Sequence, residues 1–304
     1  MLRKSRNFLL LITLLLGLFV VSLVVDRPVQ FPDPNLELEI RRLLDNYSKP
    51  IYQSELLSII ELDLSTRQIT DITGLEHFRN LEVLNLENNF IEDLNPLQTL
   101  TNLSMLNLTN NGISSLEEIH FSSLNHLNLV ELTLNSYEVL SSLGRKNQLS
   151  NIDLLSQFHE LQVLEVHGNL IRDVSALSDL TKLRTLDLGE NQIEDISPLA
   201  GLVALEEVNL SRNPIGDISA LSNLNNLVHL NLRGNEIHNI SPLAGLMGLT
   251  YLNLHSNAHI QSVEAIAELT NLSELILENV SIGEQVSVFE KLTQLTRLNI
   301  TNCD

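Results

Sequence analysis

Asparagine recurs at a fixed interval along the chain, and this period constrains the fold more than any other feature. The asparagines concerned, each 22 positions from the next, are Asn169, Asn191, Asn213, Asn235 and Asn257. The same spacing separates Asn89 from Asn111, and each asparagine closes a phrase LxxLxLxxNxI, such as LRTLDLGENQI from Leu183. A period this regular predicts a stack of similar supersecondary units.

The leucines of the phrase predict a short strand in every unit. In LxL the alternating leucines point to one face, and the residues between them point to the other. No single unit can bury its leucines alone, so the units stack and their strands pair in parallel. The asparagine amide carries a donor and an acceptor, which can satisfy buried backbone groups where the chain leaves the strand. The predicted fold class is an α/β solenoid with a parallel concave β-sheet.

The second half of each unit is repetitive as well. It reads DISPL from Asp195 and NISPL from Asn239. Serine followed by proline is a favourable helix start, with the hydroxyl as the cap and proline at the first helical position. Too few residues remain before the next strand for a long helix, so short 3₁₀ turns are expected on the convex side.

Extending the template predicts about eleven repeats over residues 59–304. The asparagine position is then filled by Arg67, Asn89, Asn111, Tyr137, Asn169, Asn191, Asn213, Asn235, Asn257, Val280 and Cys303. Tyr137 breaks the period, since the intervals that separate it from Asn111 and from Asn169 are both longer than the regular one. Residues 139–156 are therefore predicted to be an irregular insertion on the convex side or the rim.

The repeat phrase, together with DISPLAGL from Asp195, resembles the internalin-type leucine-rich repeat proteins of bacteria. Residues 31–58 resemble the helical N-terminal cap of such arrays, because Asp33 before Pro34 favours a helix start and Leu36 and Ile40 share one helical face. The resemblance implies a protein-binding module at the bacterial surface, with no enzyme activity and no cofactor. It does not identify the partner, because this scaffold serves many unrelated ones.

Residues 1–30 predict export and a short linker. Arg3, Lys4 and Arg6 precede an uncharged stretch over residues 8–25, which exceeds the usual apolar core of a signal peptide and reaches the lower limit for a membrane span. An uncleaved signal-anchor is favoured over a cleaved signal. Both alternatives place the repeats outside the cytoplasmic membrane, either anchored through residues 8–25 or secreted.

The exported part is strongly acidic. Three of the 18 basic residues lie in the first 25, which leaves 15 basic against 38 acidic residues and a net charge of −23. Nucleic acid is not expected as a partner, whereas basic partners are favoured. A single cysteine, Cys303, allows no internal disulfide. Nothing in the sequence covers the strand predicted at 295–301, which favours self-association at the C-terminal end.

The residues between the leucines are expected to form the concave surface, where equivalent residues of adjacent strands lie ~4.8 Å apart. The candidate partner-binding residues on neighbouring turns are Glu207, His229, Arg233, Tyr251 and His255. Tyrosine and arginine are enriched at interface hot spots. The alternative is a solvated surface whose residues bind nothing.

A second group places Glu165 beside Asp187, with His167 and Glu190 close by. The two carboxylates are the candidates for a divalent cation, but calcium takes six or more oxygens, so two hydrated carboxylates are favoured. His167 with either carboxylate could serve an extracytoplasmic hydrolase. The chain has no nucleophile elbow, HExxH motif or phosphate loop, which disfavours that hypothesis.

The predicted function is thus an extracytoplasmic, surface-exposed protein-binding module that uses its concave face. A regulatory or docking subunit for an envelope enzyme is the alternative.

Overall fold

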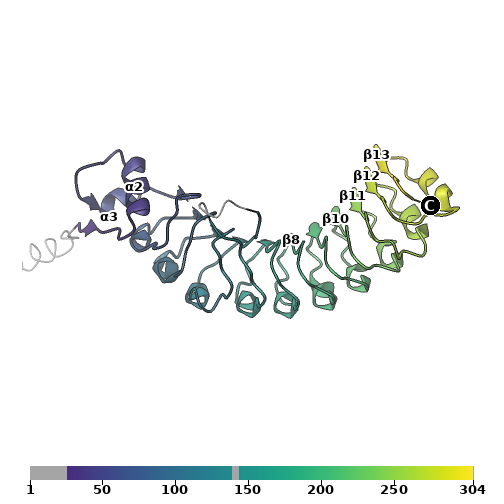
Figure 1. The fold of residues 1–304 in the computed structure, drawn as a ribbon, viewed down its shortest axis with the longest axis horizontal. Helices are drawn as coiled ribbons and strands as arrows, with labels where there is room; N and C mark the ends of the chain where they lie inside the picture. The colour runs from purple at the N-terminus through teal and green to yellow at the C-terminus, as the bar shows by residue number, and fades with distance from the viewer. Residues whose placement is uncertain (1–25, 139–143, 304) are drawn as a thin grey trace, which may run out of the picture.

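A computed structural model describes residues 26–138 and 144–303 of the chain. The described residues form a curved array with strands along its concave side and short helical turns along its convex side (Figure 1). The strands lie in one sheet in sequence order, so that each unit neighbours the one before it. The predicted solenoid with a parallel concave sheet is confirmed.

Each strand contributes a short three-residue segment to this sheet. The strands are β3 Glu61–Asp63, β4 Val83–Asn85, β5 Met105–Asn107, β6 Glu131–Thr133, β7 Val163–Glu165, β8 Thr185–Asp187, β9 Glu207–Asn209, β10 His229–Asn231, β11 Tyr251–Asn253, β12 Glu274–Ile276 and β13 Arg297–Asn299. The central residues of β3 to β12 are buried in the core, as Leu230 is in β10, whereas Leu298 in the last strand, β13, is exposed; the flanking residues face the concave surface. Pairing is in register, with His229 opposite Tyr251.

Ten short 3₁₀ helices are described on the convex side. They are η1 Leu75–His77, η2 Asn95–Thr99, η3 Phe121–Leu124, η4 Asp153–Gln157, η5 Ser175–Leu177, η6 Ser197–Gly201, η7 Ser219–Leu221, η8 Ser241–Leu243, η9 Glu264–Glu268 and η10 Gln285–Lys291. The expected capping by the serine hydroxyl is wrong. In η6 the Asp195 carboxylate accepts the N–H of Ser197 at 2.7 Å, because the preceding acid reaches the first free backbone donor.

The N-terminal end is covered by a small cap. Strands β1 Pro28–Val29 and β2 Ile51–Tyr52 pair antiparallel, and helices α2 Pro34–Leu43 and α3 Gln53–Leu56 complete it. Asp33 caps α2 by accepting the N–H of Leu36 at 3.1 Å, and its other oxygen accepts the N–H of Thr70 at 2.8 Å. One carboxylate therefore starts the helix and ties the cap to the first repeat.

No helix within residues 26–138 and 144–303 is long and apolar enough to span a membrane. The anchor predicted over residues 8–25 lies outside the described residues.

The asparagines form a buried ladder along the array, as expected. Asn191 shows the pattern: its Nδ2 donates to the carbonyls of Val166 and Leu188 at 3.0 Å each, and its Oδ1 accepts the N–H of Ile171 at 3.1 Å. Cys303 holds the same position in the last turn, as expected, with its Sγ 3.0 Å from the Leu277 carbonyl. Each side chain thus satisfies backbone groups of two adjacent turns.

The placement of Tyr137 in this ladder is wrong, because Asn147 takes the position. The Asn147 Oδ1 accepts the N–H groups of Asn111 at 3.0 Å and Ile113 at 2.9 Å, and its Nδ2 donates to the Leu108 carbonyl at 3.0 Å. Asn147 also restores the regular interval to the next ladder residue, Asn169.

The insertion predicted at residues 139–156 consequently ends too far along the chain. Leu149, Ile152 and Leu155 are buried core residues of an ordinary second half, which includes η4. Of the extra residues before Asn147, residues 144–146 lie along the strand ends, where Arg145 forms an isolated β-bridge with Asn111; residues 139–143 lie outside the described residues. A template built on leucines could not predict that Asn147 holds the ladder position, since Asn147 follows GRK instead of a leucine phrase.

Candidate binding surface on the concave sheet

The last residue of most strands closes the turn that follows it. In β9 the Asn209 Oδ1 accepts the N–H of Ser211 at 3.1 Å, and in β10 Asn231 accepts the N–H of Arg233 at 3.2 Å. Short polar side chains form this tight turn readily. Asparagine and aspartate at this position are therefore strand terminators as well as surface residues, a role that was not predicted although the column is visible in the sequence.

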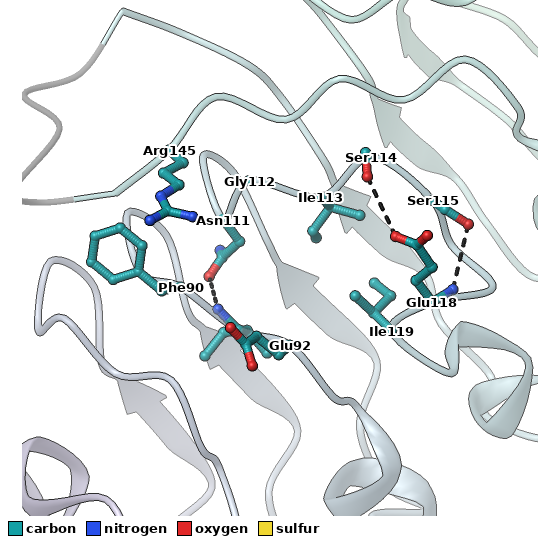
Figure 2. A pocket seen from close by; sticks show the side chains of 11 residues that line it. Phe90, Glu92, Asn111, Gly112, Ile113, Ser114, Ser115, Glu118, Ile119 and Arg145 are labelled. Carbon is teal, nitrogen blue, oxygen red and sulfur yellow. Dashed lines mark hydrogen bonds between the residues drawn. The ribbon is translucent and has the colours of Figure 1, made fainter.

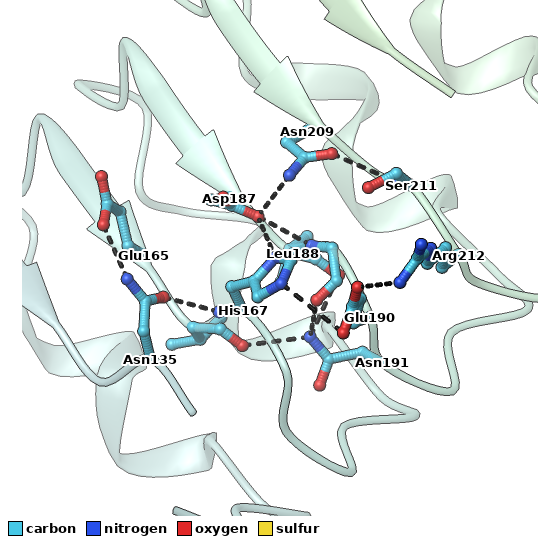
Figure 3. Close-up of polar contacts among 12 residues, drawn as sticks. Asn135, Glu165, His167, Asp187, Leu188, Glu190, Asn191, Asn209, Ser211 and Arg212 are labelled. Carbon is cyan, nitrogen blue, oxygen red and sulfur yellow. Dashed lines mark hydrogen bonds and ion pairs between the residues drawn. The ribbon is translucent and has the colours of Figure 1, made fainter. Parts of the chain in front are cut away.

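Glu165, the last residue of β7, does not close the turn that follows its strand; Asn135 closes that turn instead. The Asn135 Oδ1 accepts the N–H of His167 at 2.8 Å, while its Nδ2 donates to the Glu165 carboxylate at 2.8 Å (Figure 3). Asn135 follows the neighbouring strand β6, so the turn after β7 is closed from the adjacent unit. No pattern in the sequence signals this exchange, because Asn135 lies in a column of unrelated residues.

Asp187 is the centre of the polar network in Figure 3. Its Oδ1 accepts the N–H of Gly189 at 2.8 Å and the Asn209 Nδ2 at 2.9 Å, and it lies 3.3 Å from the His167 Nδ1. Gly189 makes this convergence possible, since a Cβ there would lie 2.7 Å from that histidine nitrogen. The expected proximity of Glu165, His167, Asp187 and Glu190 is thus observed, with Asn135 and Asn209 as additional members.

Both ring nitrogens of His167 face carboxylates. Nδ1 is paired with Asp187, and Nε2 lies 3.8 Å from Glu190, which also pairs with Arg212. The hydrogen bond with Asp187 raises the pKa of His167 above its usual value, although burial opposes the shift. The charged partner of Nε2 among the described residues is the Glu190 carboxylate, which is not a nucleophile with a proton to give, so the geometry adds no support to the hydrolase hypothesis.

The cation site considered at Glu165 and Asp187 gains no support. Among the described residues, no group of three or more histidine, cysteine, aspartate or glutamate side chains could hold a metal ion. The Glu165 carboxylate instead accepts a hydrogen bond from the Asn135 side-chain amide.

The carboxylates of this part of the surface act on two nearby titratable groups. Burial raises the pKa of Tyr137 to about 12, and the charges of Asp187 and Glu165 add to the shift. Burial also raises the pKa of Glu131 on β6, with a further contribution from Glu165. Negative charge therefore disfavours another ionised acid here and favours a cation.

The predicted partner-binding residues divide into three that lie together, Glu207, His229 and Tyr251, and two that lie apart from them, Arg233 and His255. His229 and Tyr251 stack with ring centroids 5.0 Å apart and planes 17° from parallel, and Glu207 lies opposite His229 on β9. Arg233 is exposed beyond the end of β10. His255 is turned towards the next unit, where its Nδ1 lies 3.1 Å from a Glu278 oxygen.

One pocket joins the two groups of residues that were predicted as separate sites. It has a volume of about 270 Å³ and runs across β7–β11. Its polar and aromatic lining includes Glu165, Asp187, Glu207, Asn209, His229 and Tyr251. Arg233 and His255 are not among its described lining residues, so Glu207, His229 and Tyr251 are the predicted residues that share this site.

A second pocket, of about 240 Å³, lies beside the irregular turn (Figure 2). The Arg145 guanidinium carbon lies 5.4 Å from the centroid of the Phe90 ring there, and Gly112 lies against the arginine side chain. The contacts of Arg145 hold the returning chain against two preceding units. This pocket is thus explained by the packing of the insertion.

Comparison with known proteins agrees with this architecture. A family model described as leucine-rich repeats (2 copies) matches residues 58–99, 181–223 and 225–268. The crystal structure of an internalin (InlF) from Listeria monocytogenes is 31% identical over 93% of this chain and 93% of its own, with a TM-score of 0.64. The chain belongs to the internalin family. A comparison with curated proteins returned no match.

Two further structures place this internalin-family chain among its relatives. Internalin C2 from Listeria monocytogenes is 31% identical and covers 76% of this chain and 98% of its own, with a TM-score of 0.65. A leucine-rich repeat protein of Leptospira interrogans, 21% identical over 83% of this chain and 74% of its own with a TM-score of 0.57, shares the fold. The resemblance to bacterial internalins is confirmed, and the fold is that of a protein-binding module.

Proposed function

We propose that this internalin-family chain is an extracytoplasmic, surface-exposed module that captures a protein partner on its concave face. The single observation that carries the proposal is the pocket across β7–β11, where Glu207, His229 and Tyr251 are brought together on an open sheet. A rigid sheet positions these side chains without a folding cost on binding. Arg233 is exposed beyond the end of β10, the strand that carries His229.

The extracytoplasmic location rests on the sequence of the amino-terminal segment. Three basic residues followed by the uncharged stretch 8–25 support export, with an uncleaved anchor favoured. Protease added to intact cells tests the location: the repeats should be digested while a cytoplasmic marker stays intact. Protection of the repeats until the cells are lysed would contradict the proposed location.

Partner capture tests the function. The full chain in a neutral detergent is used as bait against extracellular and envelope extracts, beside the double variant Arg233→Glu, Tyr251→Ala. The matched control is Arg172→Glu with Met247→Ala, which makes comparable changes at exposed positions outside the concave strands.

A partner retained by the wild type and the control, and lost from the concave variant, is the expected result. Equal capture by all three baits would contradict the assignment of the concave face. An enzyme as the captured partner would turn the proposal into the docking-subunit alternative, on the same surface.

A further inference from the structure

The pocket across β7–β11 is negatively charged and open to solvent. Three of its lining residues are the carboxylates Glu165, Asp187 and Glu207, and no lysine or arginine is among the described residues that line it. The other ionisable groups of that described lining are His229 and Tyr251. The pocket therefore favours a cationic occupant by charge complementarity.

The contacts made within the molecule leave much of this charge without a cation. Glu207 is exposed, and its carboxylate makes no hydrogen bond or ion pair with another residue in the described parts of the chain, whereas its neighbour Glu206 pairs with Arg184 at 2.5 Å. The Glu165 carboxylate accepts a hydrogen bond from the neutral side-chain amide of Asn135. Asp187 is paired with a titratable group, His167.

An aromatic surface adjoins these acids. The stacked rings of His229 and Tyr251 stand on β10 and β11, and His229 is the strand neighbour of Glu207. A guanidinium group is planar, donates several N–H groups in a fixed geometry to carboxylates, and stacks on aromatic rings. An ammonium group can satisfy the acids but gains less from the rings.

We propose that this pocket binds an arginine side chain of the partner protein. Glu207 and Asp187 accept hydrogen bonds from the guanidinium group, and the His229–Tyr251 pair packs against it. A volume of about 270 Å³ suits one long side chain and not a folded element. The inference rests on the proposed function, because it names the chemistry of the group that the concave face captures.

Titration with a single amino-acid derivative tests the pocket without knowledge of the partner. Nα-acetylarginine amide is added to the full chain in a neutral detergent, and the ring signals of the histidines are followed by NMR. The neutral isostere Nα-acetylcitrulline amide and the lysine analogue are the comparison ligands. We expect the His229 signals to shift, with the arginine derivative binding about tenfold or more tightly than the citrulline derivative, because charged hydrogen bonds are lost in the isostere.

Two variants locate the binding. Glu207→Gln should weaken the arginine derivative about tenfold, because it removes the carboxylate that makes no ion pair among the described residues. Asp187→Asn should weaken it as well without loss of the fold, since asparagine stands at this position in Asn209 and Asn231 and closes the same turn. Glu194→Gln, which removes the same charge at an exposed position outside the pocket, should change nothing.

Equal affinity for arginine and citrulline derivatives would overturn the proposal, as would equal losses in Glu207→Gln and Glu194→Gln. Lysine bound as tightly as arginine would overturn the assignment of arginine. Capture that depends on Arg233 and Tyr251 but no arginine binding would refute this inference and leave the proposed function intact. Binding of the arginine derivative without capture of any partner would refute the proposed function and leave the arginine pocket in place.

Discussion

The units from β7 to β11 and the unit that begins at β6 meet the same physical demand in different ways. In the regular units, an asparagine shortly after the strand bonds backbone groups of its own turn and of the turn before it, as Asn191 does. In the irregular unit more residues separate β6 from the ladder position, which Asn147 fills. Backbone groups buried at the strand ends need an amide, so the loop can lengthen only if it brings one back.

The irregular unit also changes its neighbours. Ser136 donates its N–H to the His167 carbonyl at 2.8 Å and lies against Gly168, and Asn135 closes the turn after β7. Tyr137, displaced from the ladder, packs on His167 with ring centroids 5.2 Å apart. The residues that follow β6, Asn135 to Tyr137, therefore shape the acidic part of the concave face, whereas the regular units repeat one pattern.

The largest expected effect comes from Asn147→Ala. It leaves the buried N–H groups of Asn111 and Ile113 without their acceptor, and each unsatisfied group costs about 1–3 kcal/mol. We expect the free energy of unfolding to fall by about 4 kcal/mol, measured by urea denaturation. The regular counterpart Asn191→Ala leaves one such N–H, that of Ile171, and should cost about 2 kcal/mol. A smaller loss for Asn147 than for Asn191 would show that the irregular unit does not depend on its asparagine.

Gly168→Ala should cost about 3 kcal/mol. Gly168 has φ +73°, and a Cβ there would lie 2.1 Å from the Ser136 carbonyl oxygen, so backbone strain and overpacking add. Gly234 occupies the equivalent place with φ +67°, but its nearest contact is 3.4 Å away on the flexible Arg212 side chain. Gly234→Ala is therefore the matched control and should cost about 1 kcal/mol. If Gly168→Ala and Gly234→Ala lowered the stability equally in thermal unfolding, the contact of Gly168 with Ser136 would have no special role.

Glycine introduced at the same backbone position should have opposite effects in the two regions. Ser256 has φ 57° and Asn110 has φ 55°, both left-handed. Ser256→Gly should stabilise by about 0.5 kcal/mol, because relief of the left-handed strain exceeds the added chain entropy. Asn110→Gly should destabilise by about 1 kcal/mol, since the Asn110 amide accepts the N–H of Tyr137 at 2.7 Å and donates to Asn88. Stabilisation by both changes, measured by urea denaturation, would mean that the Asn110 amide contributes little.

The smallest effect concerns pH. The pKa of His167 is raised above its usual 6.5 by the hydrogen bond with Asp187, so the folded state binds the proton more tightly than the unfolded state. This stabilisation is complete below pH 6.5 and is lost as the pH rises through the folded-state value. The free energy of unfolding should therefore decrease as the pH rises above 6.5, and Asp187→Asn should flatten that decrease. An unchanged slope in the variant would show that Asp187 is not the cause.

Much of the fold could be predicted because its pattern is local and repeated. The leucines of LxL and the asparagine that follows recur with one period, so strand positions, core and ladder follow from one phrase. The error at Tyr137 has the same origin, since the template extends a spacing and cannot know which later residue returns to the buried position. The capping error at Ser197 arose because a preceding aspartate competes for the same backbone donor.

The sequence by itself determined the solenoid, its parallel sheet and the columns of side chains on the concave face, because stacking of identical units leaves one way to bury the leucines. Only the tertiary structure decided which of those side chains act together. Asn135 reaches Glu165 from the neighbouring unit, and Glu165 lines one pocket with Tyr251, four strands away. Such contacts depend on side-chain length and on the curvature of the sheet, neither of which is encoded in the period.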